Sequence, residues 1–209
     1  MRKLLMALSL LAVAAPLAAQ AGGNGFPAGF VVRPDDPAES PAAISFVTMR
    51  PGWHITTGPS SILYDPALQG TGTYRVDAEI FLFDPGDRLE AYGVLIGGRE
   101  LSGAGQSYTY FVIRHTGEYL VRRRQGDRTE TLVEWTAHPA IMTWAGRGAG
   151  GTAKNELAVE VEENAVRFFA NGKEVGSLPR ARVDTEGVVG LRVNHDLNLH
   201  VSSLVVTKR

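Results

Sequence analysis

The chain has 209 residues and a nearly balanced charge, with 21 Lys and Arg against 22 Asp and Glu, and it contains no cysteine. The lack of cysteine excludes disulfides, thiolate metal sites and a cysteine nucleophile. The balanced charge leaves no basic excess to hold a nucleic-acid backbone, so we expect no nucleic-acid partner. The length suits one sizeable domain or two small ones.

Residues 1–21 have the three parts of a secretory signal peptide. Arg2 and Lys3 form a basic start, an apolar run follows over residues 4–15, and Ala19-Gln20-Ala21 supplies a small-residue cleavage pattern. The apolar run is short for a bilayer span. A buried N-terminal helix is the alternative. We predict a secreted or periplasmic protein with no transmembrane segment in its mature chain.

Residues 22–41 are rich in glycine and proline. These residues interrupt the hydrogen-bond ladder of a sheet, so we predict an extended leader without regular strands. The apolar side chains of Phe26 and Phe30 would anchor it. The folded domain is predicted over residues 42–209.

After Ile44 the sequence consists of short runs rich in Val, Ile, Tyr, Phe and Thr, separated by Gly, Asn, Asp and Pro. Residues 73–83 and 155–162 alternate apolar and polar side chains, which predicts strands with one buried face. Asn171-Gly172 predicts a type I′ hairpin, because that turn needs positive φ twice. Residues 115–117 predict a second hairpin.

Roughly a dozen strands at regular spacing, with no long amphipathic helix after the signal peptide, indicate an all-β fold of antiparallel sheets. An outer-membrane barrel is the alternative. Its strands must keep one face uncharged, and three consecutive arginines, Arg122 to Arg124, conflict with that requirement. We therefore predict a two-sheet β-sandwich.

Several stretches of the chain carry a resemblance to a known family: Gly52–Ile55, Ser61–Asp65, Tyr74–Glu79, Ala91–Gly98, Tyr108–Phe111, Asn155–Val161, Val166–Val175 and Gly187–Val193. In them the chain resembles the concanavalin A-like lectin/glucanase superfamily, in the laminin-G-like or DUF1080-like (3-keto-disaccharide hydrolase-like) branch of secreted bacterial proteins. The resemblance covers about residues 44–207 and implies a jelly-roll sandwich. Many relatives bind or cleave glycans on the concave sheet, although a fold alone does not transfer function.

Glycoside hydrolysis needs two carboxyl groups at a defined separation. The E-x-D-x-x-E strand of the laminarinase-type relatives is absent from the sequence. The nearest same-face pairs are Asp77 with Glu79 and Glu160 with Glu162, and polar residues of this kind normally cover the solvent face of a sheet. We therefore predict no catalytic residues.

Sugar rings stack on aromatic side chains while polar groups hold their hydroxyls. Tyr108, Tyr110 and Arg114 share one face of a strand by their spacing. We predict a site for a glycan or small saccharide formed by Tyr92, Tyr108, Tyr110, Arg114, Arg122, Arg124, His54 and His195. The alternative is a buried aromatic layer from which arginines reach outward, and for Trp53 and Trp135 we favour packing.

The five histidines do not form a metal-binding motif. His195 and His200 are five residues apart and fall on opposite faces of a regular strand. We predict no metal and no cofactor. Calcium is the alternative, with oxygen ligands drawn from Asp84, Asp87, Asp196 and Asn198, although Asp84–Asp87 is more simply a turn.

The sequence thus favours an exported carbohydrate-binding module. Two other functions stay open. One is a glycoside-cleaving enzyme of the 3-keto-disaccharide hydrolase type, whose chemistry could use other residues. The other is a structural or protein-interaction sandwich without a sugar site.

Overall fold

A computed structural model describes residues 25–209, so the predicted signal peptide lies outside the described residues. The described residues form fourteen strands and two single-turn 3-10 helices, Pro41–Ala43 and Arg180–Arg182, and contain no α-helix. The strands form two seven-stranded sheets in which every pairing is antiparallel. The predicted all-β, two-sheet sandwich is confirmed.

We name the two sheets by their strands, in spatial order. The front sheet consists of β1 (Val31–Pro34), β4 (Ser61–Gly70), β13 (Gly187–Val193), β6 (Ala91–Arg99), β7 (Ser107–Arg114), β8 (Glu118–Gln125) and β9 (Arg128–Ala137). The back sheet consists of β12 (Lys173–Pro179), β11 (Ala165–Ala170), β10 (Ala153–Val161), β5 (Tyr74–Leu82), β14 (Asn198–Lys208), β3 (Trp53–Thr56) and β2 (Ser45–Thr48).

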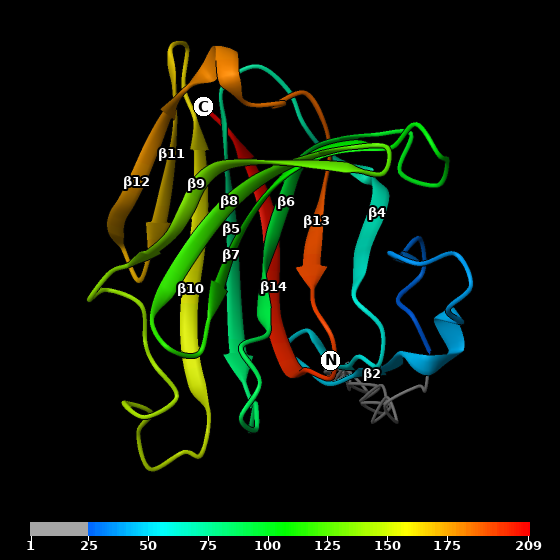
Figure 1. Ribbon diagram of the computed structural model, residues 1–209, viewed down its shortest axis with the longest axis vertical. Helices are drawn as coiled ribbons and strands as arrows, with labels where there is room; N and C mark the ends of the chain where they lie inside the picture. The colour runs from blue at the N-terminus through cyan, green and yellow to red at the C-terminus, as the bar shows by residue number, and fades with distance from the viewer. Residues whose placement is uncertain (1–24) are drawn as a thin grey trace, which may run out of the picture.

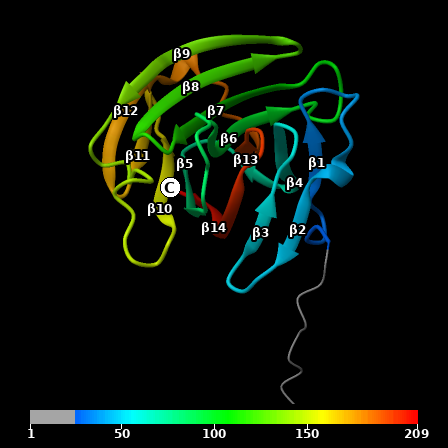
Figure 2. The ribbon, with the colours of Figure 1, turned by 60° about the horizontal axis from the view of Figure 1, so that its bottom comes forward.

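The two sheets differ in curvature. Strands β7, β8 and β9 bend strongly, whereas β10 and β5 run nearly straight (Figure 1). In Figure 2 the same strands of the front sheet arch over the back sheet.

The back sheet follows the predicted alternation. Along β5 the residues from Tyr74 to Leu82 alternate between buried and half-buried, with Val76, Ala78 and Ile80 among the buried ones. Leu157, Val159 and Val161 of the adjacent strand β10 are buried against the same core. The apolar inner faces of both sheets therefore form one core, and the outer face of the back sheet is left to polar groups.

Strand β1 lies inside the stretch predicted to be an irregular leader. Val31 to Pro34 pair with β4, from Val31 opposite Tyr64 to Pro34 opposite Ser61. The prediction that residues 22–41 hold no regular ladder is therefore wrong for these four residues. A strand at the edge of a sheet bonds on one side only, and a proline at its end removes no donor that the sheet requires.

Both predicted hairpins are present. Asn171 and Gly172 have φ angles of 49° and 75° and join β11 to β12, as a type I′ turn requires. The Asn171 side chain is also held, because its amide donates to the Ala140 carbonyl at 2.7 Å and its oxygen accepts from the Glu156 N–H at 2.8 Å. Residues 115–117 join β7 to β8 through a three-residue loop, in which Gly117 has a φ of 92°.

The turn at Gly172 gives a test of the fold. No atom lies within 4 Å of a Cβ placed on Gly172, so substitution meets backbone strain and no clash. We expect Gly172→Val to lower the free energy of unfolding by about 1–3 kcal/mol, measured by urea denaturation. Gly148→Val is the matched control, because Gly148 has equally open surroundings without a positive φ. Equal stability of the two variants would contradict the turn assignment.

Candidate functional site

The front sheet buries side chains on both of its faces. Its inner face belongs to the main core, and its outer face carries a second apolar cluster formed by Ile62, Tyr64, Ala91, Leu95, Leu101, Tyr108, Tyr110, Val112 and Leu120. The outer face of an antiparallel sheet is normally solvated. The packed outer face of this sheet, with polar groups around it, therefore differs from the solvated outer face of an ordinary antiparallel sheet. We call this surface the outer face.

Five of the eight predicted site residues lie on the outer face. The register sets Tyr110 opposite Arg122 and Tyr108 opposite Arg124, while Arg114 pairs with Ala91 on one side and Glu118 on the other. The rings of Tyr108 and Tyr110 are 5.8 Å apart between centroids. The structure thus brings these residues together, and their contact with a ligand stays a prediction.

Burial divides these residues into a floor and a polar layer above it. Tyr108 is 0% exposed and Tyr110 is 7% exposed, so both act mainly in packing. The arginines Arg114, Arg122 and Arg124 keep part of their surface open to solvent. The guanidinium groups are therefore more accessible to a ligand than the phenol rings are.

Tyr92 does not reach this face. It is 1% exposed and belongs to the core between the sheets, where its hydroxyl accepts a hydrogen bond of 3.4 Å from the Asn155 amide. Burial raises the pKa of the Tyr92 hydroxyl well above its usual value. Because side chains alternate along β6, it is Leu95 that points to the outer face. The prediction that Tyr92 belongs to the site is therefore wrong.

The two predicted histidines also lie elsewhere. His54 is in β3 of the back sheet, directly opposite His200, with 6.4 Å between the ring centroids. His195 is exposed in the turn that follows β13. Neither is part of the outer face. The sequence-based prediction placed them there because strand spacing alone does not reveal to which sheet a strand belongs.

The outer face contains a buried ion pair that sequence reasoning missed. Arg192 of β13 is 7% exposed, and both of its terminal nitrogens donate to the Asp35 carboxylate at 2.5 Å. Arg124 contacts the same carboxylate at 3.2 Å, and the Arg192 guanidinium lies 5.7 Å from the centre of the Tyr110 ring. The sequence could have indicated this ion pair, because residues 188–193 form an apolar run with a single arginine, and a buried arginine needs a partner.

The charges around Asp35 outweigh its burial. Burial alone would raise the pKa of this carboxyl, but the hydrogen bonds and charge of Arg192, with the charges of Arg124 and Arg33, hold it below its usual value. Arg33 itself hydrogen-bonds to the Gln106 side chain. The carboxylate therefore stays ionised, and it holds Arg192 and Arg124 in one region of the outer face.

A second fixed group lies at the other end of β7. The Arg114 guanidinium lies 4.4 Å from the centre of the Trp135 ring and donates two hydrogen bonds of 2.6 Å to Glu118. These bonds, with another from Thr116, lower the pKa of Glu118 to about 2. Trp135 packs on the edge of the outer cluster and stays half-buried, so one ring and one cation are presented together.

The carboxylates considered for catalysis are held in ion pairs on the back sheet. Asp77 accepts from Arg75 at 2.8 Å, and Glu79 lies 2.5 Å from Lys154. Glu160 and Glu162 are likewise paired, with Arg75 and Arg167. The ion pair with Lys154 lowers the pKa of Glu79, which is unsuited to a general acid.

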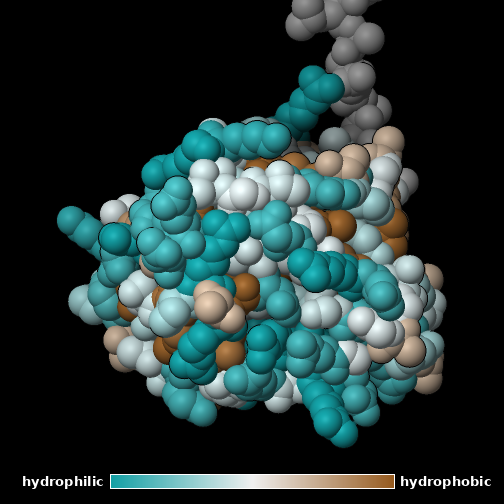
Figure 3. Space-filling view, turned by 90° about the horizontal axis from the view of Figure 1, so that it is seen from above, coloured by the Kyte–Doolittle hydropathy of each residue, from teal (hydrophilic) through white to brown (hydrophobic). Residues whose placement is uncertain are grey.

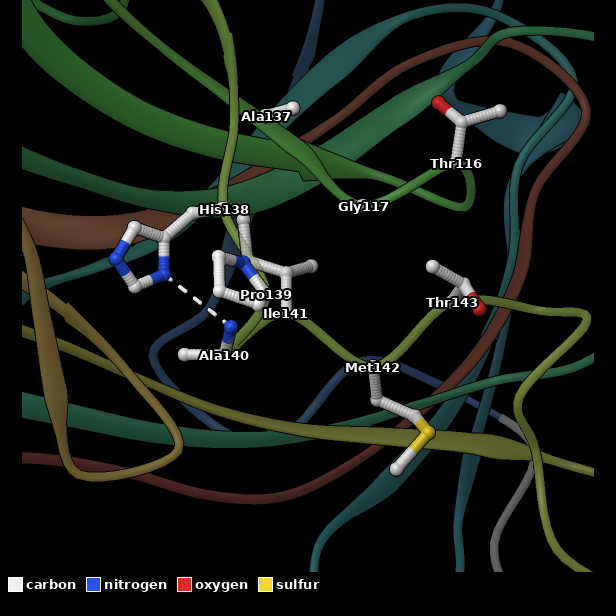
Figure 4. A pocket seen from close by; sticks show the side chains of 9 residues that line it. All are labelled: Thr116, Gly117, Ala137, His138, Pro139, Ala140, Ile141, Met142 and Thr143. Atoms are coloured by element: carbon white, nitrogen blue, oxygen red, sulfur yellow. Dashed lines mark hydrogen bonds between the residues drawn. The ribbon is translucent and has the colours of Figure 1, made fainter.

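One pocket lies beside the turn between β7 and β8 (Figure 4). Ala137 to Thr143 form most of its lining, and the His138 ring accepts a hydrogen bond of 3.2 Å from the Ala140 N–H. Its lining contains no Asp, Glu, Lys or Arg side chain. The space-filling view in Figure 3 shows a mostly hydrophilic face with small, separate apolar areas.

Within residues 25–209 no three His, Asp or Glu side chains gather in a way that could hold a metal ion. Asp84, one of the calcium candidates, accepts a hydrogen bond from the Gly86 N–H in a turn, and Asp196 forms an ion pair with Arg88. Over the same residues no helix is long and apolar enough to cross a membrane.

No model of a known protein family matches the sequence, and no curated protein is significantly similar to it. Solved structures share its fold. The carbohydrate binding module CBM66 from Bacillus subtilis has a TM-score of 0.61 at 12% identity, over 86% of this chain and 96% of that one. A glycoside hydrolase family 16 endo-glucanase from Bacteroides ovatus has a TM-score of 0.58 at 7% identity, over 87% and 96%.

A third similar structure is a Bacillus subtilis protein of unknown function with a galectin-like fold, with a TM-score of 0.53 at 8% identity over 76% of this chain and 84% of that one. Identities this low show the fold alone. The shared fold confirms the predicted two-sheet jelly-roll sandwich.

The Asp35–Arg192 pair leads to a stability prediction. Asp35→Ala leaves a buried guanidinium without its carboxylate, and we expect a loss of about 3–5 kcal/mol in the free energy of unfolding. Replacing both partners, with Asp35→Ala and Arg192→Met, removes the uncompensated charge and restores part of the loss. Urea denaturation of the three proteins measures this. A single variant as stable as the parent would contradict the pairing.

The lowered pKa of Asp35 gives a pH prediction with a definite sign. The ionised carboxylate stabilises the fold above its ordinary pKa of 3.8, and this contribution disappears as the pH falls from there through the lower folded-state pKa. Below about pH 4 we expect the free energy of unfolding to fall more steeply for the parent than for Asp35→Asn. Parallel pH profiles would refute this role of Asp35.

Proposed function

We propose that the chain is an exported carbohydrate-binding module that holds a glycan or small saccharide on the outer face of the front sheet. The observation that carries this proposal is the set of rings and guanidinium groups that are already fixed there, Trp135 with Arg114 and Tyr110 with Arg192. Such sites need apolar walls and a few placed polar groups. The fold shared with a carbohydrate binding module and an endo-glucanase supports it.

Binding is favoured over hydrolysis by the acidity of the carboxyl groups. A glycosidase needs a general acid whose pKa is raised. Asp35 and Glu118 on the outer face both have lowered pKa values, because arginines hold their ionised forms. Both residues are therefore positioning groups for arginines in this proposal. The resemblance to the DUF1080-like branch would suggest glycoside cleavage, which the product analysis described below detects.

Export remains part of the proposal and rests on the signal-peptide pattern of residues 1–21. Mass spectrometry of the protein from its native cells would locate the N-terminus. Cleavage after Ala19 or Ala21 is expected, together with recovery from the periplasm or the medium. An intact N-terminus in the cytoplasm would refute export without touching the sugar site.

The binding proposal predicts separate effects on affinity and on stability. We expect the double variant Arg114→Gln, Trp135→Ala to lose at least tenfold in affinity for the best glycan found on an array, because it removes a ring and a fixed donor together. Both side chains are partly open to solvent, so the melting temperature is expected to change little.

The matched control is Arg75→Gln, Phe169→Ala, because Arg75 lies over the Phe169 ring in the same way on the back sheet. It is expected to bind like the parent. Equal loss in both variants would place the site elsewhere. Analysis of reducing-end products in the same samples detects cleavage, which would favour the enzyme, whereas binding to no glycan at all would favour the interaction sandwich.

A further inference from the structure

The outer face holds more positive charge than its own carboxylates neutralise. Two carboxylates, Asp35 and Glu118, form ion pairs there. The arginines on the same face are Arg33, Arg114, Arg122, Arg124 and Arg192. The chain as a whole has a net charge of −1, so this concentration of arginine is local. A surface of this kind attracts anions.

Arg122 is the arginine best placed to meet a ligand. Its Nε donates to the Thr131 hydroxyl at 3.1 Å, and within the described residues no carboxylate lies at ion-pair distance from it. The residue is half-buried, and the register places it directly opposite Tyr110. Its terminal nitrogens are therefore available beside an aromatic ring and two residues before Arg124 on the same face of β8.

The outer face already binds a carboxylate of the chain itself next to Arg124. Asp35 receives two hydrogen bonds from Arg192 and a contact from Arg124 at 3.2 Å. Close by, the buried Tyr108 hydroxyl has no hydrogen-bond partner, and the register sets this residue opposite Arg124. A carboxylate brought by a ligand would find charged donors of the same kind and an unused polar group beneath them.

We propose that the saccharide of this site is acidic, a polymer of uronic acid whose carboxylates pair with Arg122 and Arg124. The proposal deepens the proposed function and depends on it. A guanidinium presents parallel donors that match the two oxygens of a carboxylate. Sugar rings next to that carboxylate would lie against the half-buried ring of Trp135 at the edge of the same face.

The test compares two polymers with the same sugar backbone whose carboxyl groups are either ionised or methyl-esterified. Isothermal titration calorimetry with polygalacturonate and with its fully methyl-esterified form measures how much of the binding the carboxylates supply. Dextran sulfate and dextran form a second pair that identifies a preference for sulfate. We expect tight binding to polygalacturonate, at least tenfold weaker binding to the ester, and a loss of affinity as salt rises.

Arg122→Gln is the decisive variant. Its side chain contributes one hydrogen bond to Thr131, so the protein is expected to fold, and a melting curve checks this. We expect affinity for polygalacturonate to fall about tenfold or more, and affinity for the ester to fall by a clearly smaller factor, because the ester loses a hydrogen-bond donor but no ion pair. Arg167→Gln removes the same charge from an exposed ion-paired site on the back sheet and is expected to bind like the parent.

The outcomes separate this inference from the proposed function. Equal binding of polygalacturonate and its ester would overturn the acidic ligand and leave the saccharide site standing. Binding to dextran sulfate without binding to polygalacturonate would overturn the choice of a carboxylate. If Arg122→Gln and Arg167→Gln lose affinity for polygalacturonate equally, the loss reflects the net charge of the protein, and the assignment of the site to the outer face is overturned. Binding to none of the four polymers would overturn the inference, and only an array without any bound glycan would overturn the proposed function.

Discussion

The front sheet has to bury side chains on both of its faces, and the rest of the structure depends on that constraint. Val94 and Leu95 are neighbours in β6, point to opposite faces, and are both fully buried. The first meets the back sheet. The second packs into the outer cluster with Tyr110, Val112 and Leu120 of the neighbouring strands β7 and β8.

The second layer in turn determines how charge is placed. Arg192 lies in this layer and is almost entirely covered, so it needs an ionised partner. That partner is Asp35, which directly follows the edge strand β1. The ion pair therefore ties the N-terminal segment of the domain to β13 in the middle of the front sheet. The strand pairing of residues 31–34 with β4 extends the same attachment.

The chemistry of the outer face follows from this packing. Rings form the floor, and arginines held by carboxylates lie above it, so donors are fixed before a ligand arrives. The same ion pairs keep Asp35 and Glu118 strongly acidic, which suits recognition and not proton donation. Among the described residues Arg122 has no carboxylate partner. The inference about the charge of the ligand rests on this unpaired guanidinium.

The local sequence pattern was sufficient to predict features that depend only on neighbouring residues, such as strands and turns. Alternation predicted β5, the residues Asn171-Gly172 predicted their turn, and spacing of two placed Tyr108 with Tyr110, because strand periodicity and turn conformation are local properties. The side on which Tyr92 lies was decided only by tertiary structure, since alternation cannot tell the core face of a sheet from a buried outer face. The pairing of Asp35 with Arg192 joins residues 157 positions apart. No local rule reaches that distance, because the contact spans from the end of β1 across β4 to β13 and exists only in the assembled sheet.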